Sequence, residues 1–175
     1  MLYIVATPIG NLKESDFYTT DGKIKMNFFT YELGDKPSQF RQVCYNNNKV
    51  VLKGLKMAFN GNSYLKPEHT FTPMIKSHCK ECYKMVEKDI KNNIRAFRTE
   101  HQVNQYIYPL YELVKYGSEI SNIKFRYCEL NEEIKEIVAS DIVSNEYQII
   151  CINDNCIKRK IDITCIKNAF EEILK

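Results

Sequence analysis

Short β-prone runs alternate with longer segments of helical periodicity along this chain, and that alternation limits the fold more than any other sequence feature. Residues 23–29 alternate apolar and polar side chains, as a half-buried strand does, residues 2–6 are apolar, and the two later runs are short and rich in β-prone residues. Pro8 and Gly10 stop the first run, and polar turn residues follow the last. The predicted strands are residues 2–6, 23–29, 124–130 and 147–152.

Four segments have the spacing of amphipathic helices. The first keeps this spacing through the asparagines at 46–48, which we attribute to base-composition bias. Thr72 is the predicted N-cap of the second, with Pro73 at its first helical position. Thr99 is the predicted N-cap of the third, and Pro109 is predicted to kink it. The predicted helices are residues 37–55, 72–90, 99–114 and 163–174.

Alternating strands and helices are typical of the α/β class. The 175 residues suit one domain at roughly 150 residues per domain. Apolar residues at 44% and charged residues at 27% are ordinary for a globular protein. We therefore expect a single domain in which a small mixed sheet is flanked by amphipathic helices. In this interpretation residues 1–12 form an atypical N-terminal strand and loop, and residues 13–175 form the domain.

Charge and cysteine content limit the partners and the location that we expect. The net charge of +3 is too small to indicate nucleic acid. No apolar run approaches the about 18 residues that a membrane-spanning helix needs, so no membrane span is expected. Seven cysteines, an odd number spread through the chain, do not resemble a secreted disulfide framework. We expect a cytoplasmic protein, with a peripheral position at the inner membrane face as the alternative.

Two pairs of cysteines raise the alternative of a zinc site. Cys79 and Cys82 lie next to His78, and Cys151 and Cys156 form a second pair. Cys79 and Cys82 fall on the apolar face of a predicted helix, where a free cysteine behaves as a small hydrophobic residue. The 68 residues between Cys82 and Cys151 fit no compact zinc module. We therefore predict no metal ligands among them and interpret His78 as an ordinary helix residue.

Four polar residues stand where ligands bind in α/β proteins. His69 and Arg98 precede the predicted N-caps of two helices, whose first turns leave backbone N–H groups free for phosphate. Arg98 adds a planar donor that suits phosphate oxygens. Asn153 and Asp154 directly follow a predicted buried strand, and ligands gather at the carboxyl ends of strands. Each residue also suits a purely structural role, and both interpretations stay open.

Four sequence blocks resemble, in order, those of the Stealth family. These proteins are sugar-1-phosphate transferases of bacterial capsule synthesis, related to the lysosomal-enzyme GlcNAc-1-phosphotransferase. The resemblance runs from about residue 13 to residue 175, and each block is short. The blocks are KESDFYTTDGK (13–23), PEHT (67–70), FRTE with QYIYPL (97–100 and 105–110), and ICINDN (150–155).

The resemblance implies part of a nucleotide-sugar transferase fold. It implies transfer of a hexose-1-phosphate from a nucleotide-diphosphate sugar to a glycan hydroxyl, with Mg²⁺ or Mn²⁺ as the divalent cation. By match of motif, His69 and Arg98 are the catalytic residues, and Asn153 and, by adjacency, Asp154 bind substrate. Arg98 would bind the transferred phosphate, and His69 would take the proton of the acceptor hydroxyl or hydrogen-bond the phosphate. Asp154 would orient a sugar or help to hold the metal.

The chain also departs from the family pattern. Family members carry an acidic NDD motif before these blocks, which supplies nucleotide and metal ligands, and no such motif precedes residue 13 in this sequence. We therefore expect an incomplete or split enzyme that resembles the acceptor-side half, with the N-terminal half supplied in trans. The alternative is a non-catalytic remnant or partner subunit that binds sugar or anion.

The first residues resemble a different family. LYIVATPIGNL (2–12) is similar to the opening of the ribosomal-RNA 2′-O-methyltransferases of the tetrapyrrole-methylase type, where this segment lines the S-adenosylmethionine site. Nothing after Leu12 continues that pattern, and neither a second glycine-rich loop nor an EDTR-like block follows. A methyltransferase fragment is the less favoured alternative.

Overall fold

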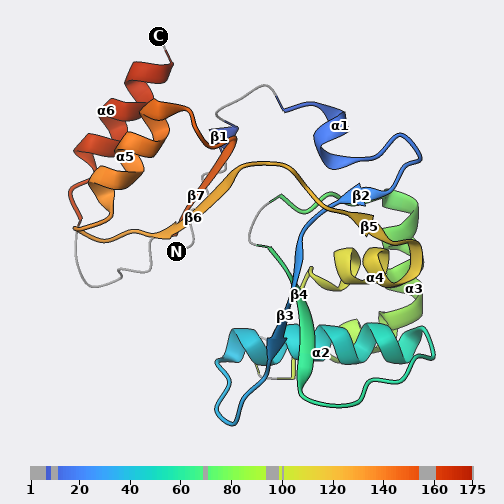
Figure 1. The fold of residues 1–175 in the computed structure, drawn as a ribbon. Coiled ribbons are helices and arrows are strands. Elements are labelled where there is room, and N and C mark those ends of the chain that lie inside the picture. Colours follow the sequence, from blue (N-terminus) through green and yellow to red (C-terminus); the bar gives the residue numbers. More distant parts are fainter. Residues whose placement is uncertain are drawn as a thin grey trace. The chain divides into compact units, whose positions relative to one another are not determined.

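The computed structural model describes residues 7–8, 12–68, 71–93, 99, 101–153 and 161–174 (Figure 1). Its helices are α1 (Glu14–Phe17), α2 (Gln39–Gly54), α3 (Lys76–Asn92), α4 (Ile107–Tyr116), α5 (Lys135–Ser144) and α6 (Thr164–Ile173). Its strands are β1 (Thr7–Pro8), β2 (Ile24–Lys25), β3 (Phe28–Glu32), β4 (Ser63–Pro67), β5 (Ser118–Glu119), β6 (Phe125–Glu129) and β7 (Ile149–Asn153). The predicted α/β class is confirmed.

The chain consists of two compact units, each held together mainly by contacts within itself. The first unit contains the described parts of 1–16, 69–71 and 122–175, and the second contains those of 17–68 and 72–121. The segment boundary expected between residues 12 and 13 stays a prediction. None of the described helices is long and apolar enough to cross a lipid bilayer.

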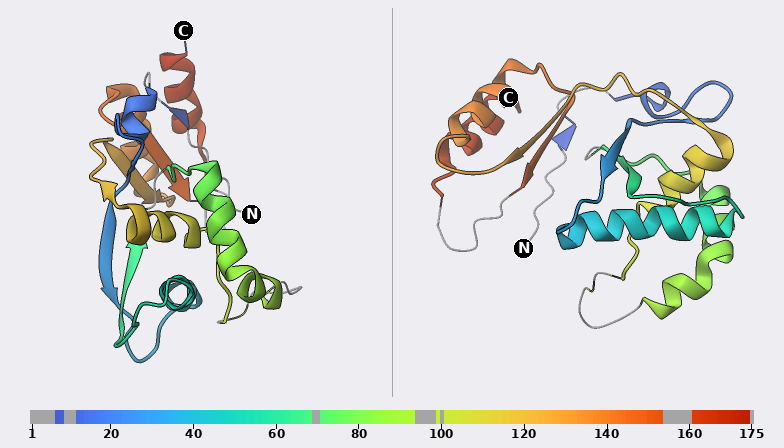
Figure 2. Two further views of the ribbon diagram at one scale, coloured as in Figure 1. Left: turned by 90° about the vertical axis from the view of Figure 1, so that its right-hand side faces the viewer. Right: turned by 60° about the horizontal axis from the view of Figure 1, so that its bottom comes forward.

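The first unit contains a small mixed sheet with the strand order β1-β7-β6. β6 and β7 are parallel, and β1 is antiparallel to β7. Parallel neighbours need a crossover connection, and α5 supplies it. α5 and α6 pack side by side, as both views of Figure 2 show. The predicted combination of a small mixed sheet and flanking helices is confirmed in this unit.

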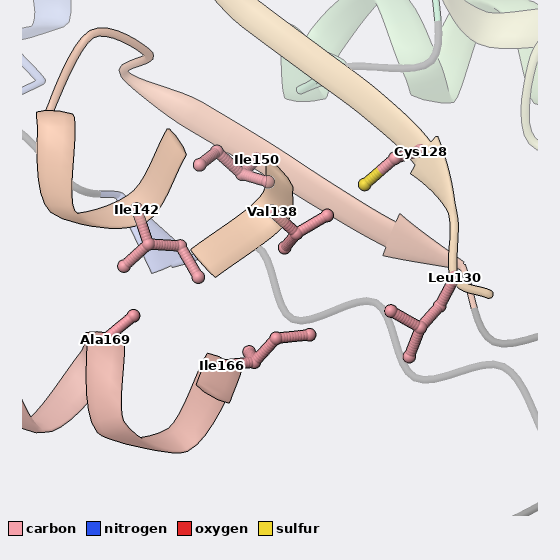
Figure 3. Packing of buried hydrophobic residues seen from close by; sticks show 7 residues of the cluster. All are labelled: Cys128, Leu130, Val138, Ile142, Ile150, Ile166 and Ala169. Carbon is pink, nitrogen blue, oxygen red and sulfur yellow. The ribbon is translucent and has the colours of Figure 1, made fainter. Parts of the chain in front are cut away.

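Apolar side chains from the strands and both helices fill the core of the first unit (Figure 3). Val138 and Ile142 of α5 are fully buried, and their spacing of four residues puts them on one face of the helix. Ile166 of α6 lies in the same cluster and Phe170 packs against it, so the middle of the period predicted for the last helix is confirmed. Its ends are not buried, because Ile163 is 37% and Leu174 is 80% exposed. The remaining buried members are Cys128, Leu130, Ile150 and Ala169.

The second unit is built around α2, α3 and α4. β3 and β4 pair antiparallel, and β2 and β5 form a short parallel pair. A second apolar cluster holds the three helices together, and Tyr111 of α4 is its largest fully buried side chain. The other buried members are Val51, Cys82, Val86, Ile107 and Leu110.

The prediction of one continuous strand over 23–29 is wrong, because the chain forms two separate strands there, β2 and β3. Its alternation still predicts burial correctly, since Met26 is only 2% exposed. The backbone changes partner at this point. Met26 donates its N–H to the carbonyl of Glu119 after pairing with β5, and the carbonyl of Asn27 accepts the N–H of Glu68 after β4. The change of partner divides the strand.

Two helices begin later than predicted. α3 begins at Lys76, so Pro73 precedes the helix instead of opening it. α4 begins at Ile107, well after the predicted cap Thr99. Pro109 therefore lies in the first turn of α4, where an N–H would have no partner within the helix. The kink predicted at this proline is wrong.

The asparagines at 46–48 have a structural role that base-composition bias does not account for. Asn47 exchanges two hydrogen bonds with Asn104, whose Oδ1 accepts from Asn47 Nδ2 at 2.7 Å and whose N–H donates to Asn47 Oδ1 at 3.0 Å. Asn48 makes a similar pair of bonds with the backbone of Leu65. Both side chains are 2% exposed. They connect α2 to the segment before α4 and to β4.

Candidate functional site

Asn153 is the predicted site residue whose surroundings are described. His69, Arg98 and Asp154 lie outside the described residues, and their roles stay predictions. Asn153 is the last residue of β7, opposite Glu129 of the parallel strand β6. It therefore stands at the carboxyl end of a central strand, the position at which open α/β sheets bind ligands.

The side-chain amide of Asn153 is hydrogen-bonded through its nitrogen, and its oxygen has no such bond with a described residue. Its Nδ2 donates to the hydroxyl of Tyr127 at 2.8 Å, and its backbone carbonyl accepts the N–H of Leu130 at 2.9 Å. Its Oδ1 is buried and accepts no hydrogen bond within the described part of the chain. A buried amide oxygen favours a donor such as a hydroxyl. Asn153 is thus oriented by Tyr127 and retains an acceptor.

Glu68, which precedes His69 in the sequence, is fixed by hydrogen bonds in the second unit. Asn27 Nδ2 donates to the Glu68 carboxylate at 2.9 Å, and the Glu68 N–H donates to the Asn27 carbonyl at the same distance. Asn27 Oδ1 also accepts the N–H of Ser121 at 3.1 Å. Glu68 is therefore held through both its backbone and its side chain.

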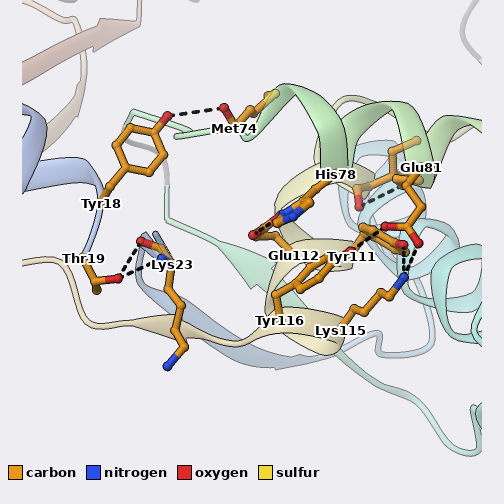
Figure 4. A network of polar contacts seen from close by, with 12 residues as sticks. Tyr18, Thr19, Lys23, Met74, His78, Glu81, Tyr111, Glu112, Lys115 and Tyr116 are labelled. Carbon is orange, nitrogen blue, oxygen red and sulfur yellow. Dashed lines mark hydrogen bonds and ion pairs between the residues drawn. The ribbon is translucent and has the colours of Figure 1, made fainter. Parts of the chain in front are cut away.

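A second polar cluster joins α3 and α4 (Figure 4). His78 Nδ1 lies 2.9 Å from both carboxylate oxygens of Glu112, which is only 4% exposed. The His78 ring is stacked on the ring of Tyr116, with centroids 3.8 Å apart and planes within 8°. Hydrogen bonding to a buried carboxylate fixes which face and which nitrogen the imidazole presents.

The outer part of this cluster is an ion pair with two tyrosines around it. Lys115 pairs with Glu81, and Tyr116 donates its hydroxyl to the same carboxylate at 2.5 Å. Lys115 Nζ also donates to the Tyr111 hydroxyl at 3.0 Å. The Lys115 ammonium, and then the Tyr116 hydroxyl, hold the pKa of Glu81 down at about 2. The Glu81 carboxylate in turn raises the pKa of Lys115.

Sequence reasoning placed His78 on a helix but missed its partner. The local signal is Glu112 itself, the one acidic residue of α4, whose other residues apart from Lys115 are apolar or aromatic. Such a carboxylate is unfavourable to bury without a hydrogen-bonding partner, so a partner from another element is expected. His78 and Glu112 are 34 residues apart, and periodicity along one helix does not reveal such a pair.

The cysteines of the described chain are buried or partly buried. Cys82 is fully buried, and burial raises its pKa to about 12. Burial also raises the pKa of Cys79. Zinc binds the thiolate form, which this environment disfavours. The described residues contain no cluster of three or more metal-ligating side chains, and Asp154, to which the resemblance gives a role at the metal, lies outside them, so the divalent cation stays a prediction.

No protein-family model matches this sequence, and a search of curated proteins gives no match either. The resemblance to the Stealth family therefore rests on the four ordered blocks and stays a prediction.

Proposed function

We propose that this chain takes part in sugar-1-phosphate transfer from a nucleotide-diphosphate sugar to a glycan hydroxyl in capsule or exopolysaccharide synthesis. The observation that carries the proposal is the order of the four blocks between residues 13 and 155, which is that of the Stealth family. Four short motifs in one order are more specific than any of them alone. We propose a cytoplasmic location for the reaction, with the protein peripheral to the inner membrane face.

In the proposed reaction the acceptor oxygen forms a bond to the phosphorus that carries the sugar. The bond between that phosphorus and the oxygen bridging to the nucleotide breaks, and a nucleoside monophosphate leaves. His69 takes the proton of the acceptor hydroxyl, and Arg98 neutralises charge on the oxygens of the transferred phosphate. Such transfers depend mainly on positioning and charge, so a histidine and an arginine suffice for these two roles.

Asn153 is the proposed acceptor-binding residue. Its amide is oriented by the Tyr127 hydroxyl at 2.8 Å, while its Oδ1 keeps a free acceptor within the described chain. Because Oδ1 is buried in this conformation, a sugar hydroxyl reaches and satisfies this atom only when the side chains that cover it move aside. Asp154 follows Asn153 and is proposed to bind sugar by adjacency alone. A divalent cation would neutralise phosphate charge when bound, but the described residues supply no site for it, and no step is assigned to it.

The proposal is tested with a labelled nucleotide-sugar, a capsule oligosaccharide and Mg²⁺ or Mn²⁺. The chain is assayed alone and together with a polypeptide that carries the acidic N-terminal half of a Stealth-family transferase. We expect labelled phosphodiester product in the combined reaction. Arg98→Ala should lower its rate by about 10²–10³-fold, as removal of one charge-stabilising donor does in other enzymes. No product in the combined reaction contradicts the proposal.

A matched pair of histidine variants provides the control. His69→Ala is expected to abolish transfer, whereas His101→Ala, at an exposed histidine of the described chain, should leave the rate unchanged. An equal loss in both variants would show that neither histidine acts specifically.

The second candidate function is binding of sugar without turnover, favoured by the position of Asn153 at the carboxyl end of a central strand, where open α/β sheets bind ligands. It predicts that calorimetry detects saturable binding of the acceptor oligosaccharide while the reconstituted reaction gives no product. Asn153→Ala should then weaken acceptor binding. If neither the acceptor nor the nucleotide-sugar binds, this function is excluded as well.

A further inference from the structure

The strand β3 of the second unit has one edge along which no described strand lies. β3 and β4 form a two-stranded antiparallel sheet. On its other side β4 contacts α2, and the left view of Figure 2 shows β4 between β3 and this helix. Thr30 and Glu32 of β3 are exposed. The outer edge of β3 is therefore accessible.

The register of the sheet shows which backbone groups face this outer edge. In an antiparallel pair, directly opposed residues alternate between those that exchange hydrogen bonds and those that do not. Leu33 donates its N–H to the Asn62 carbonyl just after β3, and Glu68 donates its N–H to the Asn27 carbonyl just before it, both at 2.9 Å. The odd-numbered residues of β3 therefore bond to β4, and the even-numbered ones turn their N–H and C=O groups away from it.

The opposite edge of the sheet supports this direction independently. Leu65 of β4 lies opposite Thr30, and its N–H and carbonyl both bond to the side-chain amide of Asn48 in α2. The backbone groups of Leu65 are thus turned away from β3, as an opposed pair without mutual hydrogen bonds requires. The outward residues of β3 are Phe28, Thr30 and Glu32, and their backbone groups bond to no described residue outside the sheet.

The same edge accepts a strand just before β3. Met26 donates its N–H to the Glu119 carbonyl at 2.9 Å, next to the short parallel pair of β2 and β5. Met26 lies two residues before Phe28, so the backbone N–H groups of both residues face the same edge. β5 ends at Glu119, and no described strand continues along the edge beyond it.

β3 also lacks the features that usually protect a free edge. Proteins cover such edges or place lysine, proline or a bulge on them. The sequence of β3 is FFTYE, and its one charged residue, Glu32, is at the end. Phe29 is 45% and Tyr31 is 36% exposed, and Tyr31 is stacked on Tyr64 of β4 with ring centroids 6.0 Å apart. An ordered, aromatic and unprotected edge favours pairing with another strand.

We propose that the outer edge of β3 pairs antiparallel with the same edge of a second copy of this chain. Thr30 lies opposite Thr30 of the second copy, and the two sheets combine into one of four strands. The three outward residues of each copy then form about six hydrogen bonds across the new pair. This surface involves none of the residues assigned to sugar-phosphate transfer, so it stands or falls independently of that proposed function.

The sequence of β3 favours a second copy because it is complementary to itself about Thr30. In this register Phe29 of each copy lies opposite Tyr31 of the other, and Phe28 lies opposite Glu32. Aromatic pairs and threonine pairs are favourable neighbours across antiparallel strands, whereas like charges opposite each other are unfavourable. The register provides two aromatic pairs and one threonine pair and brings no like charges of β3 together.

Analytical ultracentrifugation of the full chain over a range of concentrations tests the proposal. Wild type should form a dimer. Thr30→Pro removes an outward N–H and no bond to β4, a replacement that edge strands accept, and should be monomeric. Amide hydrogen exchange provides a second readout. The N–H of Thr30 should gain protection as the protein concentration rises, whereas the N–H of Tyr31, which faces β4, should not.

Two charge variants test whether the partner is a second copy in this register. Thr30→Lys and Thr30→Glu each place like charges opposite each other and should weaken the dimer about fivefold or more. An equimolar mixture of the two places opposite charges there and should restore the affinity. Thr20→Lys and Thr20→Glu, at an exposed threonine of the turn before β2, are the matched controls and should change it by less than about twofold.

Three results would overturn the proposal. The first is a wild type that stays monomeric up to about 1 mM, where even weak association is detected. The second is a Thr30→Pro variant that dimerises as wild type does, and the third is a charge mixture that binds no more tightly than either variant alone. A monomer whose Thr30 N–H is nevertheless protected would assign the edge to a segment of the same chain. Thr30 is exposed, so the charge variants decide the question even if Thr30→Pro does not fold.

Discussion

Replacing Asn48 by alanine should destabilise the second unit through the backbone of β4. Asn48 Nδ2 donates to the Leu65 carbonyl at 2.7 Å, and Asn48 Oδ1 accepts the Leu65 N–H at 2.9 Å. The side-chain amide therefore pairs with β4 as a neighbouring strand would. Alanine leaves both backbone groups unpaired, at about 1–3 kcal/mol each when water is excluded. Because Leu65 is only partly buried, we expect the lower end, about 2 kcal/mol in total.

Two measurements test this prediction. Urea unfolding gives the change in the free energy of unfolding, and amide hydrogen exchange reports on the Leu65 N–H itself, which should lose protection in Asn48→Ala. Asn60→Ala, at an exposed asparagine, is the matched control and should fall within about 0.5 kcal/mol of wild type. If Asn48→Ala matches that control and Leu65 keeps its protection, the strand-like role of Asn48 is refuted.

Three further predictions concern the two cores and the α3–α4 cluster. Ile142→Ala, at a fully buried residue, should lower the free energy of unfolding by about 2–5 kcal/mol, while Ile137→Ala, 45% exposed, should change it far less in the same urea experiment. The pKa of Glu81 is lowered from 4.5 to about 2, so its ion pair stabilises the fold above pH 4.5, and this stabilisation is lost as the pH falls toward 2. The unfolding midpoints of wild type and Glu81→Gln should therefore converge over that range. Cys82 should resist iodoacetamide at pH 8 in the folded protein and react once urea unfolds the chain. Mass spectrometry measures this modification, and modification of Cys82 without urea would contradict its burial.

Elements whose pattern is local were predicted well. β6, β7 and α6 follow from short apolar runs or from a helical period, and their observed bounds lie close to the predicted ones. In the turn before β2, Gly22 adopts a φ of 83°, a conformation that favours glycine. These features depend on neighbours within a few residues, so the order of residues carries the information.

Other elements depend on partners far along the chain and were missed. β4 carries no strong strand pattern, yet it pairs with β3 along its whole length. α5 was not predicted either, and its burial comes from packing against α6. Thr72 with Pro73 favoured an earlier start for α3, and Thr99 favoured one for α4. Such local preferences are weak, and the tertiary context overrides them.

The candidate sites divide in the same way. The position of Asn153 at the end of β7 follows from the strand pattern, since a polar residue directly after a buried strand must lie at its carboxyl end. The partners His78–Glu112 and Asn48–Leu65 do not follow from any pattern, because each joins residues from different elements. The roles of His69, Arg98 and Asp154 rest on motif resemblance.

The order of amino acids alone determined the α/β class, the two parallel strands of the first unit and the apolar face in the middle of the last helix. Hydrophobic burial with a fixed period is a property of each segment, so it can be recognised before the chain folds. Only the tertiary structure decided which buried polar groups meet, as His78 and Glu112 do. Hydrogen bonds and ion pairs form between specific atoms a few ångströms apart, and that proximity exists only once distant segments have packed together.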